Sequence, residues 1–125
     1  MNYLAIDYGK KNIGLAVSIN GIISPVNAIK NDSQLSKNIE SIIDQYEISK
    51  IFVGISQNRS GFSTKSFMER LKNMLDLPIE GVEETVSTIE ATQIFKQNKN
   101  NKKQLKSKID SISAAVILSR ALGQY

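Results

Sequence analysis

The hydrophobic positions along the chain fall into short continuous runs and longer one-sided stripes. The short runs are rich in β-branched residues and are bounded by turn-forming or charged residues, which is typical of strands. They predict strands at residues 3–7, 13–18, 21–29, 50–56 and 78–84. Asn20 and Gly21, between the second and third runs, are a strong signal for a hairpin turn.

The one-sided stripes predict helices, because their apolar residues recur every three or four positions. The first stripe contains Leu35, Ile39, Ile42, Ile43 and Tyr46, and the second, after a polar loop at residues 57–64, contains Phe67, Leu71, Met74 and Leu75. Residues 87–90 have the spacing of a capping box, which starts a further helix. A last helix over residues 109–122 is apolar around most of its circumference, and we expect it to be buried.

The order of these elements is β-β-β-α-β-α-β-α-α. Three consecutive strands with tight turns predict an antiparallel meander, whereas the later strand–helix–strand units predict parallel pairing. A mixed five-stranded sheet flanked by helices accounts for both. The length of 125 residues is that of one domain, so we expect residues 1–125 to form a single α/β domain.

The composition restricts the chemistry that the chain can perform. There is no cysteine and no histidine, which excludes disulfides, zinc sites built on thiolate or imidazole, and cysteine or serine–histidine nucleophiles. Carboxylates remain, and they suit hard cations such as Mg²⁺ and Mn²⁺. No apolar run is long enough to cross a bilayer and the first residues do not resemble a signal peptide, so we expect a cytoplasmic protein without a membrane partner.

Four acids lie at the ends of predicted elements: Asp7, Glu83, Glu84 and Asp110. Asp7 ends the first strand, the glutamate pair ends the last strand, and Asp110 lies at the entrance of the last helix. Separately, they have simple explanations as a turn residue, loop acids and a helix cap. If the two strands are parallel, however, their carboxyl ends meet at one sheet edge, where carboxylates repel one another unless a cation neutralises them. The pattern therefore favours a divalent-metal site.

The net charge of +4 is unevenly distributed, since residues 96–108 contain six lysines and no acid. One interpretation is a solvated surface in a lysine- and asparagine-rich chain. The other is a basic segment that binds phosphates beside an active site.

Four sequence blocks occur in the order and spacing of the YqgF family, also called RuvX-like Holliday junction resolvases or pre-16S rRNA nucleases. The blocks are AIDYGKKNIGLAVS, IFVGIS…SG, EETVSTIEA and IDSISAAVIL, and the resemblance covers residues 4–122. It implies an RNase H-like domain with sheet order 3-2-1-4-5, a metal-dependent nuclease that hydrolyses phosphodiester bonds, and a bacterial cytoplasmic location.

The resemblance also assigns roles to individual residues. Asp7, Glu84 and Asp110 match the catalytic acids, which would hold two Mg²⁺ or Mn²⁺ ions, and Glu83 is a neighbouring or alternative acid. The residues expected to contact the nucleic acid are all basic: Lys10, Lys11, Arg59, Lys96, Lys99, Lys102, Lys103, Lys106 and Lys108.

The chain departs from the family pattern at four positions. Asn12 and Thr85 stand where the family usually has arginines, Glu83 replaces an aspartate, and Ser56 replaces a proline. Lost arginines remove bidentate phosphate donors that lysine does not replace geometrically.

Three interpretations follow. The first is an endonuclease for structured RNA, maturing the 5′ end of pre-16S rRNA, in some cases on ribosomal precursor particles. The second is a resolvase of branched DNA, which calls for a two-fold dimer, although the sequence is equally consistent with a monomer or a weak homodimer. The third is a nucleic-acid-binding module without catalysis. An actin-like ATPase shares the opening motif but needs two related domains.

Overall fold

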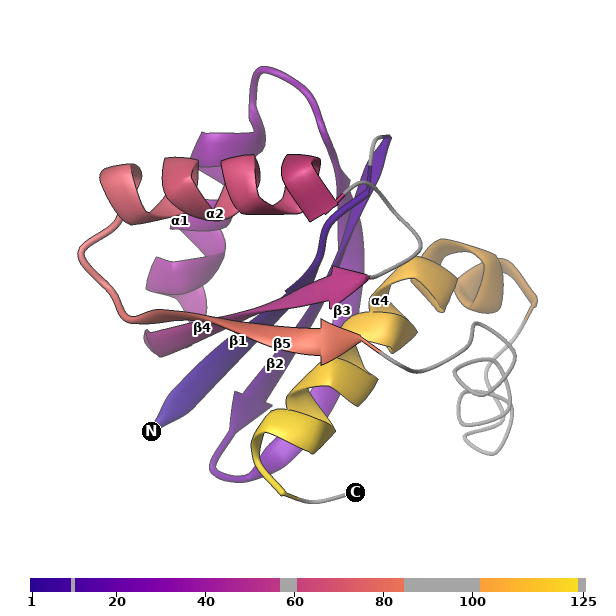
Figure 1. Cartoon of the computed structure of the whole chain (residues 1–125). Helices are drawn as coiled ribbons and strands as arrows, with labels where there is room; N and C mark the ends of the chain where they lie inside the picture. The colour runs from indigo at the N-terminus through magenta and orange to yellow at the C-terminus, as the bar shows by residue number, and fades with distance from the viewer. Residues whose placement is uncertain (10, 57–60, 85–101, 124–125) are drawn as a thin grey trace.

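The structure is a computed structural model, and it describes residues 1–9, 11–56, 61–84 and 102–123. Five strands form one mixed sheet in the order β3-β2-β1-β4-β5, which confirms the predicted fold class and strand order (Figure 1). The strands are β1 (Asn2–Asp7), β2 (Asn12–Ile19), β3 (Ile22–Lys30), β4 (Ile48–Ser56) and β5 (Ile79–Glu84).

The first three strands form the predicted antiparallel meander. The β2–β3 turn is made by Asn20 and Gly21, whose φ angles are 53° and 84°. Two consecutive positive φ angles are the geometry of the turn that best matches the twist of a hairpin, and asparagine followed by glycine is the favoured pair for it. The hairpin prediction is therefore confirmed.

The other half of the sheet is parallel, with β1 next to β4 and β4 next to β5. Helix α1 (Leu35–Tyr46) connects β3 to β4, and helix α2 (Gly61–Met74) connects β4 to β5. The prediction of a polar loop at residues 57–64 is wrong from Gly61 onward. The first turn of α2 contains Gly61, Ser63 and Thr64 and has no apolar period, so its sequence pattern does not distinguish it from a loop.

Successive residues of β1 pack into two different cores. Leu4 and Ile6 belong to a cluster with residues of α1 and α2, whereas Ala5, between them, packs against helix α4 (Lys102–Ala121). Figure 1 shows α1 and α2 on one face of the sheet and α4 on the other. The buried β4 alternates in the same way, with Val53 on the α1–α2 side and Phe52 on the α4 side, as its continuous apolar run predicts.

Helix α4 begins earlier than its apolar pattern suggests. Asp110, predicted at the entrance of the last helix, lies eight residues after the first residue, Lys102. The preceding lysine-rich turns have strong helix formers but no apolar stripe, so propensity and not periodicity accounts for them. The helix predicted from residue 87 lies outside the described residues. Within the described residues, no helix is both long and apolar enough to cross a bilayer.

Candidate active site at the carboxyl edge of the sheet

Asp7 is the last residue of β1, and it is only 7% exposed. Its cross-strand neighbours are glycines on both sides: Gly14 on the antiparallel β2 and Gly54 on the parallel β4. Side chains of directly opposite residues in a sheet normally lie about 5 Å apart. Because glycine has no side chain, neither neighbouring strand fills the space beside the Asp7 carboxylate.

Asp7 lies on the face of the sheet that α4 covers. Along β1, Tyr3 and Ala5 both pack with α4-side residues, and Asp7 continues this row because side chains alternate between the two faces of a strand. The α1–α2 face receives the intervening Leu4 and Ile6. Asp7 is therefore a nearly buried carboxylate at the end of an otherwise apolar row.

The two glutamates of β5 occupy successive register positions opposite Ile55 and Ser56 of β4. Val82, two residues before Glu84, is opposite Gly54 and packs on the α4 side. Glu84 thus takes the position that continues this row, and Glu83 takes a position in the other row. With two strand spacings and two residues of rise between them, the Cα atoms of Asp7 and Glu84 are about 12 Å apart.

The third predicted acid, Asp110, directly precedes Ser111, and Ser111 connects helix α4 to this edge of the sheet. Ser111 is fully buried, and its Oγ accepts a hydrogen bond of 3.2 Å from the backbone N–H of Leu15. Leu15 directly follows Gly14, the residue opposite Asp7. The turn of α4 that contains Asp110 is therefore attached to β2 next to Asp7's cross-strand neighbour.

The loop after Asp7 is held in place by hydrogen bonds from Asn31, the residue that follows β3. The Asn31 side-chain amide donates a hydrogen bond of 2.9 Å to the carbonyl of Gly9, and the Asn31 backbone N–H donates one of 2.8 Å to the carbonyl of Lys11. Tyr8 packs its ring against Phe67 of α2, with 4.6 Å between ring centroids. These contacts support the loop that presents Lys11, whose side chain is exposed.

The remaining predicted basic residues are placed only in part. Lys10, Arg59, Lys96 and Lys99 lie outside the described residues. The other predicted lysines lie in the first turns of α4, where the structure describes the backbone: Lys102, Lys103, Lys106 and Lys108.

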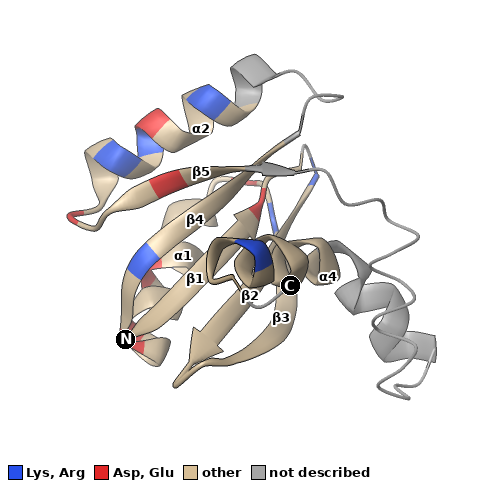
Figure 2. Ribbon diagram, turned by 60° about the horizontal axis from the view of Figure 1, so that its bottom comes forward, with Lys and Arg blue, Asp and Glu red and all other residues tan. Residues whose placement is uncertain are grey.

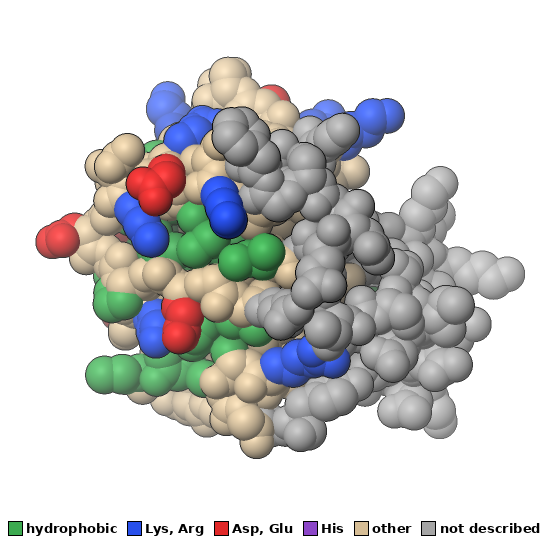
Figure 3. All heavy atoms as spheres, in the orientation of Figure 1, with side chains coloured by type: hydrophobic (Ala, Val, Ile, Leu, Met, Phe, Trp, Pro, Cys, Tyr) green, Lys and Arg blue, Asp and Glu red, His purple; other side chains and the backbone are tan. Residues whose placement is uncertain are grey.

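Along α2, basic and acidic residues are interspersed (Figure 2), and apolar side chains are exposed between α2 and β5 (Figure 3). The described surface there is mixed in charge, without a single basic patch.

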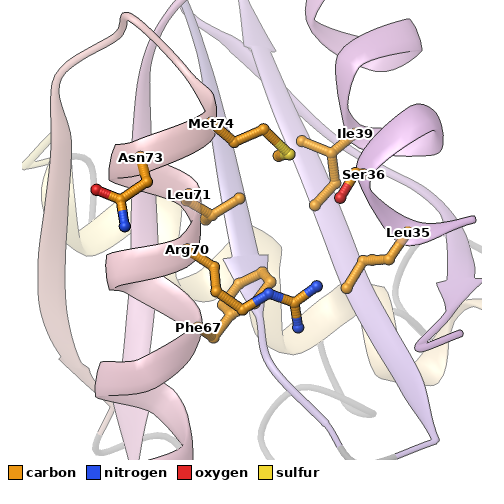
Figure 4. A pocket seen from close by; sticks show the side chains of 8 residues that line it. All are labelled: Leu35, Ser36, Ile39, Phe67, Arg70, Leu71, Asn73 and Met74. Carbon is orange, nitrogen blue, oxygen red and sulfur yellow. The ribbon is translucent and has the colours of Figure 1, made fainter. Parts of the chain in front are cut away.

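A hollow of about 300 Å³ lies between α1 and α2, on the face of the sheet opposite to α4 (Figure 4). Its wall is mainly apolar, from residues such as Ile39, Phe67 and Met74, with Arg70 as the charged side chain. No acid lines it among the described residues. The hollow therefore lacks the groups that the predicted chemistry requires, and the candidate site remains at the carboxyl edge on the α4 side.

The donor set at this edge fits a hard divalent cation in type. The predicted donors are the carboxylates of Asp7, Glu84 and Asp110, and the sequence contains no competing thiolate or imidazole. Among the side chains that the structure describes, no three acidic residues form a metal-ligand group. The side chains of Glu84 and Asp110 lie outside that set, so the backbone positions of these two residues carry the assignment.

Two residues that shape this site, Ser111 and Asn31, are not among the residues predicted from the sequence. Ser111 is a polar residue inside an apolar helical stretch, and that mismatch is the signal that could have identified it. Asn31 follows the third strand and has no comparable signal, because asparagine is common in any turn.

Solved structures with similar folds include the fowlpox virus Holliday junction resolvase, with a TM-score of 0.66 and 15% identity over 98% of this chain and 97% of that one. The RuvC structure from Thermus thermophilus has a TM-score of 0.58 and 11% identity over 99% and 98% of the two chains. These likenesses confirm the predicted RNase H-like fold.

Curated relatives match the chain over almost its full length. A Sulfurovum protein named "Putative pre-16S rRNA nuclease" is 35% identical over an alignment 130 positions long, which covers 98% of this chain and 98% of that one. A protein of the same name from Sulfurihydrogenibium is 37% identical over 95% of this chain and 88% of its own length. The family model described as "RuvX: Holliday junction resolvase" matches residues 1–124, and the chain therefore belongs to the RuvX family.

Proposed function

We propose that this protein is a divalent-metal-dependent endonuclease that hydrolyses phosphodiester bonds in structured RNA, in the maturation of the 5′ end of pre-16S rRNA. The observation that carries the proposal is the position of Asp7, a nearly buried carboxylate at the carboxyl ends of parallel strands, with glycines on both sides. This edge is where open α/β sheets bind ligands. The names of the curated relatives support the RNA substrate.

In this proposal Asp7, Glu84 and Asp110 hold two Mg²⁺ or Mn²⁺ ions, with Glu83 in the opposite row of β5. When bound, such ions supply an activated water and neutralise the charge on the leaving oxygen of the phosphodiester. Asp7 and Glu84 take register positions that continue the α4-side rows of β1 and β5, and Asp110 belongs to α4 itself. In the proposal the phosphate would approach beside Asp7, where Gly14 and Gly54 of the neighbouring strands place no side chain.

The basic residues have a separate role in the proposal. Lys11 lies in the loop after Asp7, and the α4 lysines precede Asp110 on the same helix. Lysines contact the phosphate backbone without reading sequence, so substrate choice would rest on RNA shape or on a ribosomal precursor particle. Such a role places the protein in the cytoplasm and requires no dimer.

A second candidate is the resolution of branched DNA, favoured by the description of the matching family model. The two functions are separated by incubating the purified chain with a labelled 16S rRNA precursor and with a four-way DNA junction. Each substrate is tested with Mg²⁺, with Mn²⁺ and with chelator. Asp76→Asn is a matched control for Asp7→Asn, because Asp76 is exposed and follows α2.

The expected result is metal-dependent cleavage of the RNA precursor, lost in Asp7→Asn and kept in Asp76→Asn. Preferential cleavage of the junction would support the resolvase instead. Binding without cleavage under every condition would contradict both and would support a catalytically silent module, with Asn12 and Thr85 as the first residues to revert to arginine.

A further inference from the structure

The Ser111–Leu15 hydrogen bond joins two elements that are 96 residues apart in sequence. The serine is on the sheet-facing side of α4, where it is completely buried, and the N–H belongs to β2, which lies between β3 and β1 in the sheet. A serine is unusual on an apolar helix face unless its hydroxyl has a hydrogen-bond partner, because a buried hydroxyl without such a partner is destabilising.

The Leu15 N–H is at an irregular point of the sheet. The pairing of β2 with β3 shifts register between Ile13 and Leu15, whereas the pairing with β1 continues without interruption from Tyr3 to Asp7. A register shift of this kind disrupts the ladder locally and leaves backbone groups without strand partners. Buried backbone N–H groups are nearly always satisfied, and here the hydroxyl of Ser111 accepts the bond.

The remaining contacts of α4 with the sheet fix its position less sharply. The helix packs through Ala114, Ile117 and Leu118 against Ala5 and Ala16. Such apolar contacts are non-directional, and small alanines let a helix approach closely without locking it in one register. A slide of one residue would move α4 by about 1.5 Å along its axis and rotate Asp110 by about 100°. A hydrogen bond does not tolerate that displacement.

We propose that Ser111 is a positioning residue that sets the register of α4 on β2 and thereby holds Asp110 at the metal site. The hydrogen bond connects positions close to two proposed ligands. Ser111 directly follows Asp110 in sequence, and Leu15 directly follows Gly14, which lies opposite Asp7. The inference rests on the proposed function, because it concerns the same metal site. It assigns the serine no contact with the metal or the substrate.

The test uses the full chain and Mn²⁺ alone, titrated by electron paramagnetic resonance. Ser111→Ala removes the acceptor, and Ser111→Cys keeps a weaker one in case the alanine variant does not fold. Ser113→Ala is the matched control, because it makes the same change two residues along the same helix at a half-buried position. Amide hydrogen exchange at Leu15, followed by NMR, reports on the bond itself.

We expect the dissociation constant for Mn²⁺ to rise about tenfold in Ser111→Ala, as is usual when groups that orient metal ligands are removed. The dissociation constant should rise less in Ser111→Cys and stay within about twofold of the wild-type value in Ser113→Ala. Protection of the Leu15 amide from exchange should be highest in the wild type, lower in Ser111→Cys and lowest in Ser111→Ala. A folded Ser111 variant with wild-type Mn²⁺ affinity would overturn the inference while leaving the proposed function intact. Absence of Mn²⁺ binding in the wild type would refute the metal site itself.

Discussion

Replacing Ser18 with alanine is expected to stabilise the protein. Ser18 is 1% exposed on β2, between Tyr3 of β1 and Ile23 of β3, and its Oγ has no hydrogen-bond partner in the part of the chain that the structure describes. In the unfolded chain the same hydroxyl is hydrated. Burying it without a partner therefore subtracts from the free energy of unfolding.

The size of the effect follows from that burial. An unsatisfied buried polar group costs about 1–3 kcal/mol, and Ser18→Ala removes the oxygen while keeping every carbon of the side chain. Allowing for the lost contacts of the oxygen, we expect the free energy of unfolding to rise by about 1 kcal/mol. For a chain of this length that corresponds to an increase of about 3–5 °C in Tm.

Urea denaturation followed by circular dichroism measures this change, with an unchanged m-value showing that the unfolding transition is the same. Ser24→Ala is the control, because Ser24 is exposed on the adjacent β3 and its replacement should change stability by less than about 0.5 kcal/mol. A Ser18→Ala variant that is no more stable than the wild type would contradict this prediction and would show that the buried hydroxyl has a stabilising partner.

Three further predictions concern the core, the loop after Asp7 and the lysines. Ile39→Ala should lower the free energy of unfolding by about 2–5 kcal/mol in urea denaturation, because Ile39 is fully buried between α1 and the sheet. Asn31→Ala should destabilise by about 1 kcal/mol and speed amide exchange in residues 8–12, because it removes the bond to Gly9; unchanged exchange would show that the bond does not hold the loop. Glutamine at three of the α4 lysines should weaken RNA binding and reduce the slope of log affinity against log salt by about 2–3, whereas glutamine at three lysines of the α1–α2 side should leave that slope unchanged. Equal slopes for the two variants would show that the α4 lysines are a solvated surface without a role in RNA binding. The two sets are Lys102, Lys103 and Lys106, and Lys37, Lys65 and Lys72.

The strands were predictable because local patterns agree with the final pairing, whereas their order in the sheet was expected only from the family resemblance. Asn20 and Gly21 specify one hairpin turn, and the apolar run of β4 requires burial on both faces. The start of α4 was not predictable from periodicity, because Lys102 and its neighbours are helical by propensity alone. Amphipathic patterns report on burial, so a helical turn without a buried stripe leaves no such pattern.

The candidate site was predictable as a set of residue types and not as an arrangement. Asp7 ends an apolar run, which the sequence shows, but its position between Gly14 and Gly54 depends on pairing with two distant segments. The bond from Leu15 to Ser111 likewise depends on a register shift between β2 and β3. Contacts between residues so far apart in the chain have no local sequence signal.

The most direct test of the account is anomalous X-ray diffraction from crystals grown with Mn²⁺. We predict an anomalous peak about 2 Å from a carboxylate oxygen of Asp7, on the α4 side of the sheet, with Glu84 and Asp110 as further ligands. Peaks confined to other parts of the surface, with the Asp7 carboxylate free of metal, would contradict the assignment of this edge as the active site.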